Sequence, residues 1–252
     1  MKLLVVLRMM PDPACELELL EDSPGLDHEW LDFKLNDFDD QALEEAILLK
    51  EACGGEVIAL GCGEGAGRVL QMALARGADR AIEYETEPDD MISSRVIARD
   101  VAAIAKNEGV DLVLTGVQAA EDLHGQLAPY LSAILNWPGL SGTSRVALAN
   151  TGLAVSQERG GGVTAHYELT LPAVLGVQTA SKAPRYVSGS KLREASKLPI
   201  ATAAAEAERL EPSGELLKLA RPQRDEAATS LGGTAEDAAA KFLDLIRSGA
   251  VA

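Results

Sequence analysis

The feature that most constrains this sequence is a repeated alternation of short apolar runs with helical patterns before Pro138. The apolar runs are Leu3–Leu7, Val57–Leu60, Ala81–Tyr84 and Leu112–Leu114. The run Leu112–Leu114 is short and bounded by turn signals, as expected for a strand buried on both faces of a parallel sheet. Apolar residues at helical spacing follow each run, within Leu43–Lys50, Val69–Leu74, Met91–Lys106 and Leu127–Leu135. We therefore predict an α/β fold with a doubly wound, mostly parallel sheet.

The pattern changes after Pro138. Short strands with glycine-containing turns are predicted at Ser144–Leu148, Leu153–Gln157 and Val163–Thr170, and a buried strand at Ala173–Val177. Residues 199–233 are rich in Ala, Glu, Pro and Gly and carry too little apolar bulk for a core, and a last helix begins at Thr234. We expect an α/β domain over residues 1–190. Residues 191–252 should form a docking loop, an extended arm and a C-terminal helix.

Composition excludes several classes of function. The formal net charge is −16, which disfavours binding to nucleic acid or to an anionic membrane surface. The apolar run after Met1 ends before Arg8 and is too short for a signal peptide or a membrane span. The cysteines form no C-x-x-C pair and no histidine lies at ligand spacing from a cysteine, so we expect a cytoplasmic protein without a metal site.

The loop Gln118–Pro129 joins an apolar run to a helical pattern. A strand, a loop and a helix N-terminus in this order can bind an anion, because the first helical N–H groups lack partners. Glu121 and Asp122 in this loop argue against a strongly anionic ligand. A second candidate is Asn36–Asp40, which also reads as an ordinary helix start with acidic residues matched to the helix dipole.

A glycine-rich turn offers an alternative. Gly61–Ala66 fits G-x-G-x-x-A, and Glu83 or Glu85 follows at about the distance of a dinucleotide fingerprint. This unit contains the second strand of the predicted sheet, not the first, and glycine-rich turns also serve packing. An NAD-dependent oxidoreductase therefore stays an alternative, as does a nucleotide-sensing binding module.

A basic island interrupts the acidic chain at Lys182–Lys197, which carries five cations and a single Glu194. It reads either as a solvated loop or as a docking surface for an acidic partner. No Ser-His-Asp, Cys-His or paired-carboxylate arrangement stands out, so no catalytic residue is predicted.

A series of motifs runs along most of the chain in order. The motifs are N-D-F-D-D-Q-A-L-E-E-A (Asn36–Ala46), E-V-I-A-L-G-C-G (Glu56–Gly63), A-R-G-A-D-R-A-I (Ala75–Ile82), D-L-V-L-T-G-V-Q-A (Asp111–Ala119), N-W-P (Asn136–Pro138), L-P-A-V (Leu171–Val174) and P-R-Y (Pro184–Tyr186). Together they resemble the β subunit of electron transfer flavoprotein. The acidic pair after Phe38 and the G-V-Q segment resemble the forms that serve amine dehydrogenases.

The resemblance implies an α/β domain of the adenine-nucleotide-binding type, an added β segment and an arm that embraces an α subunit. FAD would be bound mainly by the α subunit, and AMP by this chain. A flavoprotein dehydrogenase would donate electrons. The nucleotide would lie near Val6, Asn36, Asp37, Phe38, Asp39, Cys62, Gln118, Ala119, Glu121, Asp122, His124, Gly125, Gln126, Leu127, Ala128 and Pro129. Phe38 would approach the flavin, and the donor would dock near Pro184, Arg185, Tyr186, Gly189, Lys191 and Arg193.

Two departures from the family pattern matter. Gln126-Leu127-Ala128 replaces Q-T-G at the phosphate-facing helix start, which removes a hydroxyl and adds a methyl group where close backbone approach is needed. AMP binding is therefore expected to be weakened, and a second FAD in this chain is not expected. Gly189 replaces the leucine of the family's docking loop, so the apolar anchor is missing or displaced.

Overall fold

The structure is a computed structural model of the whole chain. It describes residues 1–20, 24–27, 31–63, 65–84, 93–120, 122, 124–203, 217–221 and 230–249. The chain divides into two compact units, Met1–Leu216 and Leu217–Ala252, and each is treated by itself.

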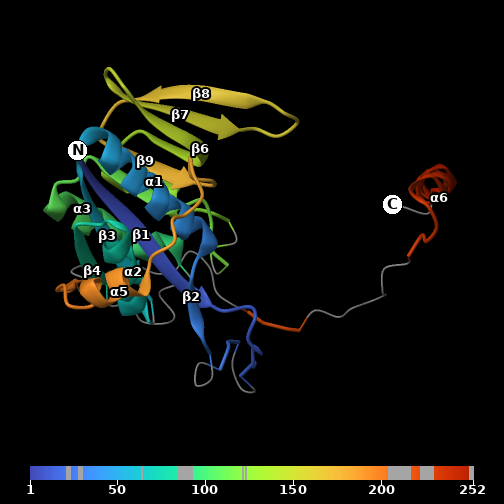
Figure 1. Cartoon of the computed structure of the whole chain (residues 1–252), viewed down its shortest axis with the longest axis horizontal. Helices are drawn as coiled ribbons and strands as arrows, with labels where there is room; N and C mark the ends of the chain where they lie inside the picture. The colour runs from blue at the N-terminus through green and yellow to red at the C-terminus, as the bar shows by residue number, and fades with distance from the viewer. Residues whose placement is uncertain are drawn as a thin grey trace. The chain divides into compact units, whose positions relative to one another are not determined.

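The first unit is built on one mixed, mostly parallel sheet (Figure 1). Its order is β10-β4-β3-β1-β5-β9-β6-β7-β8, and β2 pairs with β1. The strands are β1 (Lys2–Pro11), β2 (Phe33–Leu35), β3 (Glu56–Cys62), β4 (Arg80–Tyr84), β5 (Leu112–Gly116), β6 (Gly139–Ala149), β7 (Gly152–Glu158), β8 (Thr164–Leu169), β9 (Ala173–Val177) and β10 (Ala201–Ala203). From β10 through β6 the neighbouring strands are parallel, whereas β7 and β8 are antiparallel. The predicted α/β fold with a mostly parallel sheet is confirmed.

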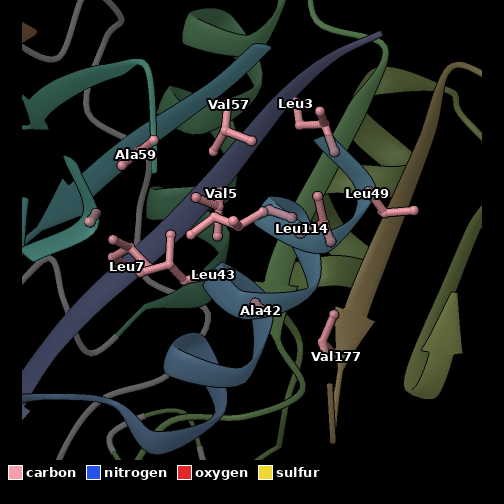
Figure 2. Close-up of a cluster of buried hydrophobic side chains, with 14 of the residues drawn as sticks. Leu3, Val5, Leu7, Ala42, Leu43, Leu49, Val57, Ala59, Leu114 and Val177 are labelled. Atoms are coloured by element: carbon pink, nitrogen blue, oxygen red, sulfur yellow. The ribbon is translucent and has the colours of Figure 1, made fainter. Parts of the chain in front are cut away.

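Helices cover both faces of this sheet. One apolar cluster joins α1 (Asp37–Cys53), α2 (Ala66–Arg76) and α5 (Gly189–Ala195) to one face, and Figure 2 shows side chains of β1, α1 and β3 interleaved there. A second cluster joins α3 (Ser94–Glu108) and α4 (Leu127–Leu135) to the opposite face. Successive residues of β1 alternate between the two clusters, as the pleat of a strand buried on both sides requires.

The position of β9 determines the second half of the sheet. This strand follows the β6–β8 segment in sequence, yet it lies between β5 and β6 in the sheet. All five of its residues are buried, which explains the continuous apolar run from Ala173 to Val177. The predicted strands at 144–148, 153–157 and 163–170 are present as β6, β7 and β8.

The C-terminal unit contains α6 (Ala235–Ser248). Thr234 and Asp237 form a capping box, as the sequence pattern predicts. Phe242, Leu243, Leu245 and Ile246 are exposed large apolar side chains. The sequence-based division at residue 190 concerns which segments pack on a partner chain, and it stays a prediction. None of the helices in the described ranges combines the length and the apolarity that crossing a membrane would require.

Candidate functional site

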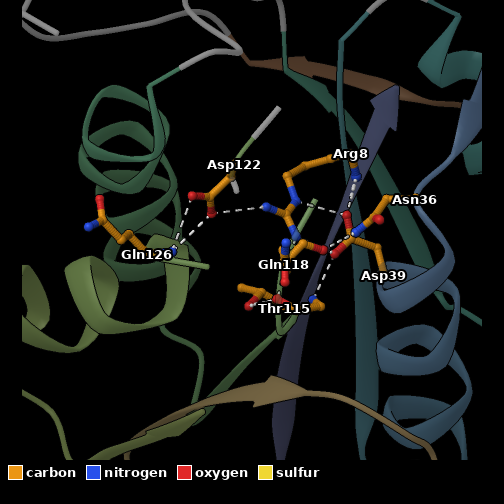
Figure 3. A network of polar contacts seen from close by, with 8 residues as sticks. Arg8, Asn36, Asp39, Thr115, Gln118, Asp122 and Gln126 are labelled. Carbon is orange, nitrogen blue, oxygen red and sulfur yellow. Dashed lines mark hydrogen bonds and ion pairs between the residues drawn. The ribbon is translucent and has the colours of Figure 1, made fainter. Parts of the chain in front are cut away.

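The sheet has a topological switch point between β1 and β5. The chain builds outward from β1 through β3 and β4 on one side, and α3 then carries it back to β5 on the other. In open α/β sheets the ligand-binding crevice lies at such a point, beyond the carboxyl ends of the strands. Here the parallel pairing of β1 with β3 ends at Arg8, and β5 ends at Gly116. Asp39 in the first turn of α1 binds both residues, and Figure 3 shows it beside Arg8.

A buried ion pair organises this point. Arg8 is 2% exposed and Asp39 is fully buried. The Arg8 guanidinium donates to both carboxylate oxygens of Asp39 at 2.9 Å, and the Arg8 backbone N–H donates to Oδ2 at 2.8 Å. The Gly116 N–H donates to Oδ1 at 2.7 Å. Because every donor of this set is buried, Asp39 joins β1, β5 and α1 at one place.

Gly116 is required at this position. A Cβ at this residue would lie 2.7 Å from the backbone nitrogen of Asp39, a separation that real Cβ atoms do not show.

Asn36 completes the junction, because its Nδ2 donates to the Gln118 carbonyl oxygen at 2.8 Å. Its side chain therefore does not cap α1, contrary to the ordinary reading of an Asn before a helix. The link instead fixes the β5–α4 loop against the start of α1.

A carboxylate of the chain itself accepts the backbone N–H at the start of α4. Asp122 is buried, and its carboxylate accepts from the Gln126 backbone N–H at 3.0 Å. Its Oδ2 also lies 3.7 Å from an Arg8 guanidinium nitrogen. Pro129, the third residue of α4, has no N–H to offer. An added phosphate would meet a like charge and a guanidinium already paired with two carboxylates, so these residues do not fit one well.

Leu127 and Ala128 belong to the core. Both are buried in the cluster that packs α4 against the sheet. A Cβ at Gly176 of β9 would lie 3.2 Å from the Ala128 Cβ, which places that methyl group toward the sheet. The replacement of the family's Thr and Gly by Leu127 and Ala128 therefore serves helix packing in this chain.

Cys62 lies at the end of β3, opposite Arg8 in the strand register. Burial raises the pKa of the Cys62 thiol to about 12, and the neighbouring Asp39 carboxylate adds to this rise. The thiol is therefore neutral and a poor nucleophile. Val6, also fully buried, contributes apolar bulk at the same end of the sheet.

The glycine-rich turn between β3 and α2 is explained by packing. A Cβ at Gly61 would lie 2.9 Å from Leu70 and 3.0 Å from Ala66, so the glycine allows α2 to approach β3. The turn does not lie at the switch point. Glu83 is in β4, and Glu85 lies outside the described residues.

The remaining predicted nucleotide residues are dispersed. Asp37 is exposed and pairs with Lys34, while Phe38 is half-buried in the first turn of α1. Ala119 is buried in the loop after β5, whereas His124 is exposed. Gly125 has a left-handed backbone with φ of 61°. Glu121 lies outside the described residues.

The predicted docking residues lie around α5, a helix that the sequence pattern does not reveal. Tyr186 is 93% exposed, and Lys191 and Arg193 are exposed as well. Arg185 differs from them, because its guanidinium is bound to Glu44 and Glu51 of α1. A Cβ at Gly189 would have no heavy atom within 4 Å, so this position has room for a side chain.

Arg8 is the site residue that the motifs do not identify. Its sequence signal is a lone cation inside a run of buried apolar residues, which is stable only when a carboxylate pairs with it.

Within the described ranges, His, Cys, Asp and Glu side chains form no group that could hold a metal ion.

Comparison with known proteins identifies related sequences. Residues 26–211 match the model of the electron transfer flavoprotein domain. The electron transfer flavoprotein subunit beta of Methylophilus methylotrophus is 27% identical, with 98% of both chains covered. The human protein of that name is 33% identical over 79% of this chain and 80% of its own length. A mitochondrial counterpart from Oryza sativa subsp. indica is 32% identical over 75% of this chain and 76% of its own.

Proposed function

This chain belongs to the electron transfer flavoprotein family, and from this membership we propose that it is the β subunit of a heterodimer with an α subunit. The family acts in electron transport with flavin. The observation that carries the proposal is a family match spanning residues 26–211, which include α1, β5 and α4 of the switch point but not β1. The chain is an electron carrier subunit and not an enzyme with its own substrate.

FAD, bound mainly by the α subunit, supplies the redox chemistry. The family resemblance assigns Phe38 to the side of this chain that faces the flavin. In support, Phe38 is half-buried in the first turn of α1, next to Asp39. The Arg8–Asp39 pair and the Asn36–Gln118 link hold that turn in place. The role of this chain is therefore to orient and shield one side of the cofactor.

The pairing with α rests on the C-terminal unit. The apolar side chains Phe242, Leu243, Leu245 and Ile246 of α6 are exposed in this chain. An apolar helix face of this kind is typical of an interface with another chain. We assign residues 191–252 to docking and to the embrace of the α subunit.

The donor is proposed to be a flavoprotein dehydrogenase that docks on the segment Pro184–Lys197, here named the docking segment. Lys191, Arg193 and Lys197 are exposed on it. Leu192, between the first two cations, and Tyr186, which precedes them, are exposed as well. In a chain of net charge −16 this surface suits an acidic partner. The segment Asn36–Asp40 resembles that of family forms which serve amine dehydrogenases, so an amine dehydrogenase is a candidate donor.

AMP is proposed to bind weakly or not at all, and a second FAD is not proposed. Asp122 and Asp39 already pair with Arg8, and Asp122 already accepts a hydrogen bond from the Gln126 N–H before α4.

The test is anaerobic mixing of the α–β complex with a substrate-reduced flavoprotein dehydrogenase. We expect reduction of the complex's flavin, followed by reoxidation by an acceptor. NAD-dependent turnover by this chain without α would instead support the oxidoreductase alternative.

A further inference from the structure

One face of α1 is lined with carboxylate and amide side chains that the electron-transfer role does not explain. These side chains are Gln41, Glu44, Glu45 and Glu51. Glu44 and Glu45 are 2% and 1% exposed. Carboxylates are rarely buried to this extent unless they are fully paired. Their partners lie in a single stretch of the chain after β9, together with one backbone group of β6.

The first part of that stretch is held by backbone donors. The Gln41 side-chain oxygen accepts from the Ala180 N–H at 3.0 Å. Glu45 accepts from the N–H of Ser181 at 2.6 Å and from its hydroxyl at 2.9 Å. Glu45 also accepts from the Val146 N–H of β6 at 3.1 Å. These bonds fix the chain where it leaves the sheet.

The second part is held by a charged clamp. Arg185 donates to the Glu44 carboxylate through its backbone N–H at 3.0 Å and its Nε at 2.9 Å. A terminal guanidinium nitrogen lies 2.8 Å from Glu44 Oε1, and the guanidinium also bonds Glu51 at 2.5 Å and 3.2 Å. This planar fork between two carboxylates specifies one orientation of Arg185.

The clamp lies at the entrance of the docking segment. Tyr186 follows Arg185 directly and is 93% exposed, and Val187 is buried again. α5 then begins at Gly189, with Ser188 capping it, and its Ala195 is buried in the α1–α2 core cluster. The docking segment is thus fixed at one end by Arg185 and at the other by Ala195. The exposed residues between these points include Tyr186, Lys191 and Arg193, which are assigned to the donor.

We propose that Glu44 and Glu51 are positioning residues that act through Arg185 to hold the docking segment in its donor-competent conformation. The inference rests on the proposed function of that segment. Because α1 also carries Phe38 and Asp39 at its N-terminus, the clamp connects the donor surface to the helix that faces the flavin. Release of the clamp would populate conformations of the segment that do not bind the donor, which raises the apparent KM by the inverse of the competent fraction.

The experiment compares Glu44→Gln and Glu51→Gln in the α–β complex. Glu158→Gln, an exposed glutamate of β7, is the matched control. We expect the apparent KM for the reduced donor to rise about threefold to tenfold in both clamp variants. The limiting rate at saturating donor and the flavin content should stay unchanged. A Glu44→Gln/Arg185→Gln double variant should raise the apparent KM no more than the stronger of its two single variants, Glu44→Gln and Arg185→Gln. The reason is that the two residues act as one unit.

Amide hydrogen exchange of residues 180–197 supplies a readout independent of donor chemistry. Exchange should accelerate in both clamp variants and not in Glu158→Gln. Glu51 is the safer site for folding, because its side chain is 54% exposed. Unchanged KM and unchanged exchange in Glu51→Gln would overturn the inference, as would a loss confined to the limiting rate and flavin content. Failure of the unmodified complex to accept electrons from any flavoprotein dehydrogenase would refute the proposed function instead, while the exchange data would still decide whether the clamp holds the segment.

Discussion

At the scale of single residues, the Arg8–Asp39 pair determines the geometry of the switch point. The pair is buried, and its hydrogen bonds connect two strands with the start of α1. A buried ion pair adds little net stability compared with an apolar pair, but removal of one partner leaves an uncompensated charge. Its main contribution here is specificity, because it selects the register of α1 relative to β1 and β5.

Asp39→Asn is therefore expected to be strongly destabilising. The free energy of unfolding should fall by about 3–5 kcal/mol, because the Arg8 cation loses its buried counter-charge. Chemical denaturation of the variant measures this. Asp37→Asn is the control, since it lies in the same helix turn but its side chain is 83% exposed beside Lys34. The control should change by less than about 1 kcal/mol, and equal losses in the two variants would contradict this role of the ion pair.

At this scale the sequence predicts which residues form the site better than it predicts what they bind. Asn36, Asp39, Gln118, Asp122 and Gln126 follow from the family motif, and the structure connects them directly or through Arg8. The motif does not show the roles that two of these residues play. Asn36 bonds a loop instead of capping α1, and Asp122 pairs with a cation contributed by the first strand. Such pairings depend on the sheet order, which local patterns do not contain.

At the scale of elements, α1 was predictable and α5 was not. Acidic residues after Asn36 and the glycines after Cys53 mark the ends of α1, and its C-cap Gly54 has the left-handed backbone expected there. α5 spans only Gly189–Ala195 and buries a single residue, so it lacks an apolar period. Its formation depends on the Ser188 cap and on contact with α2, which reading along the sequence does not reveal.

Reversal of the exposed charges on α5 should slow donor encounter. A Lys191→Glu/Arg193→Glu variant should reduce the second-order rate of electron transfer from the dehydrogenase by roughly tenfold at low salt. The difference should shrink as salt screens both proteins. Stopped-flow measurements at several ionic strengths test this, with Glu158→Gln as control. Equal rates at low and high salt would show that the docking segment does not steer the donor.

Gly189→Leu should restore an apolar anchor. The space around a Cβ at this position is open and φ is not in the left-handed region, so the side chain fits without backbone strain. Burial of a leucine against a partner is worth about 1.5–3 kcal/mol, and the KM for a donor with an apolar pocket should fall by about tenfold or more. Gly189→Ser is the control, because Gly160 in the turn between β7 and β8 has a left-handed φ of 80° and would be strained by a side chain. An equal fall in KM in Gly189→Ser would refute an apolar anchor.

At the scale of the whole molecule, two features could not be predicted from the sequence. The first is the insertion of β9 between β5 and β6, a long-range pairing that strand patterns cannot specify. The second is β10, which pairs with β4 and extends the sheet beyond Pro184, where the sequence shows no further alternation. The buried strands and both helical layers were predictable, because burial on both faces leaves continuous apolar runs.

The nucleotide content of the complex tests the account of the switch point. Denaturation of the purified α–β complex should release one FAD and less than one equivalent of AMP. The reason is that Asp122 and Asp39 already satisfy the cation and the N–H group at the anion position. Chromatographic quantification of the released nucleotides decides the question. Stoichiometric AMP, or two FAD per heterodimer, would contradict it.

We propose that this chain is one half of a flavoprotein and does not hold the flavin by itself. The most direct measurement is the flavin stoichiometry and mass of the chain purified with and without the α subunit. We expect a heterodimer with one tightly bound FAD. The isolated chain should lose FAD and behave poorly in solution, because the apolar face of α6 is exposed. A stable monomer that retains a full equivalent of FAD without α would contradict the account.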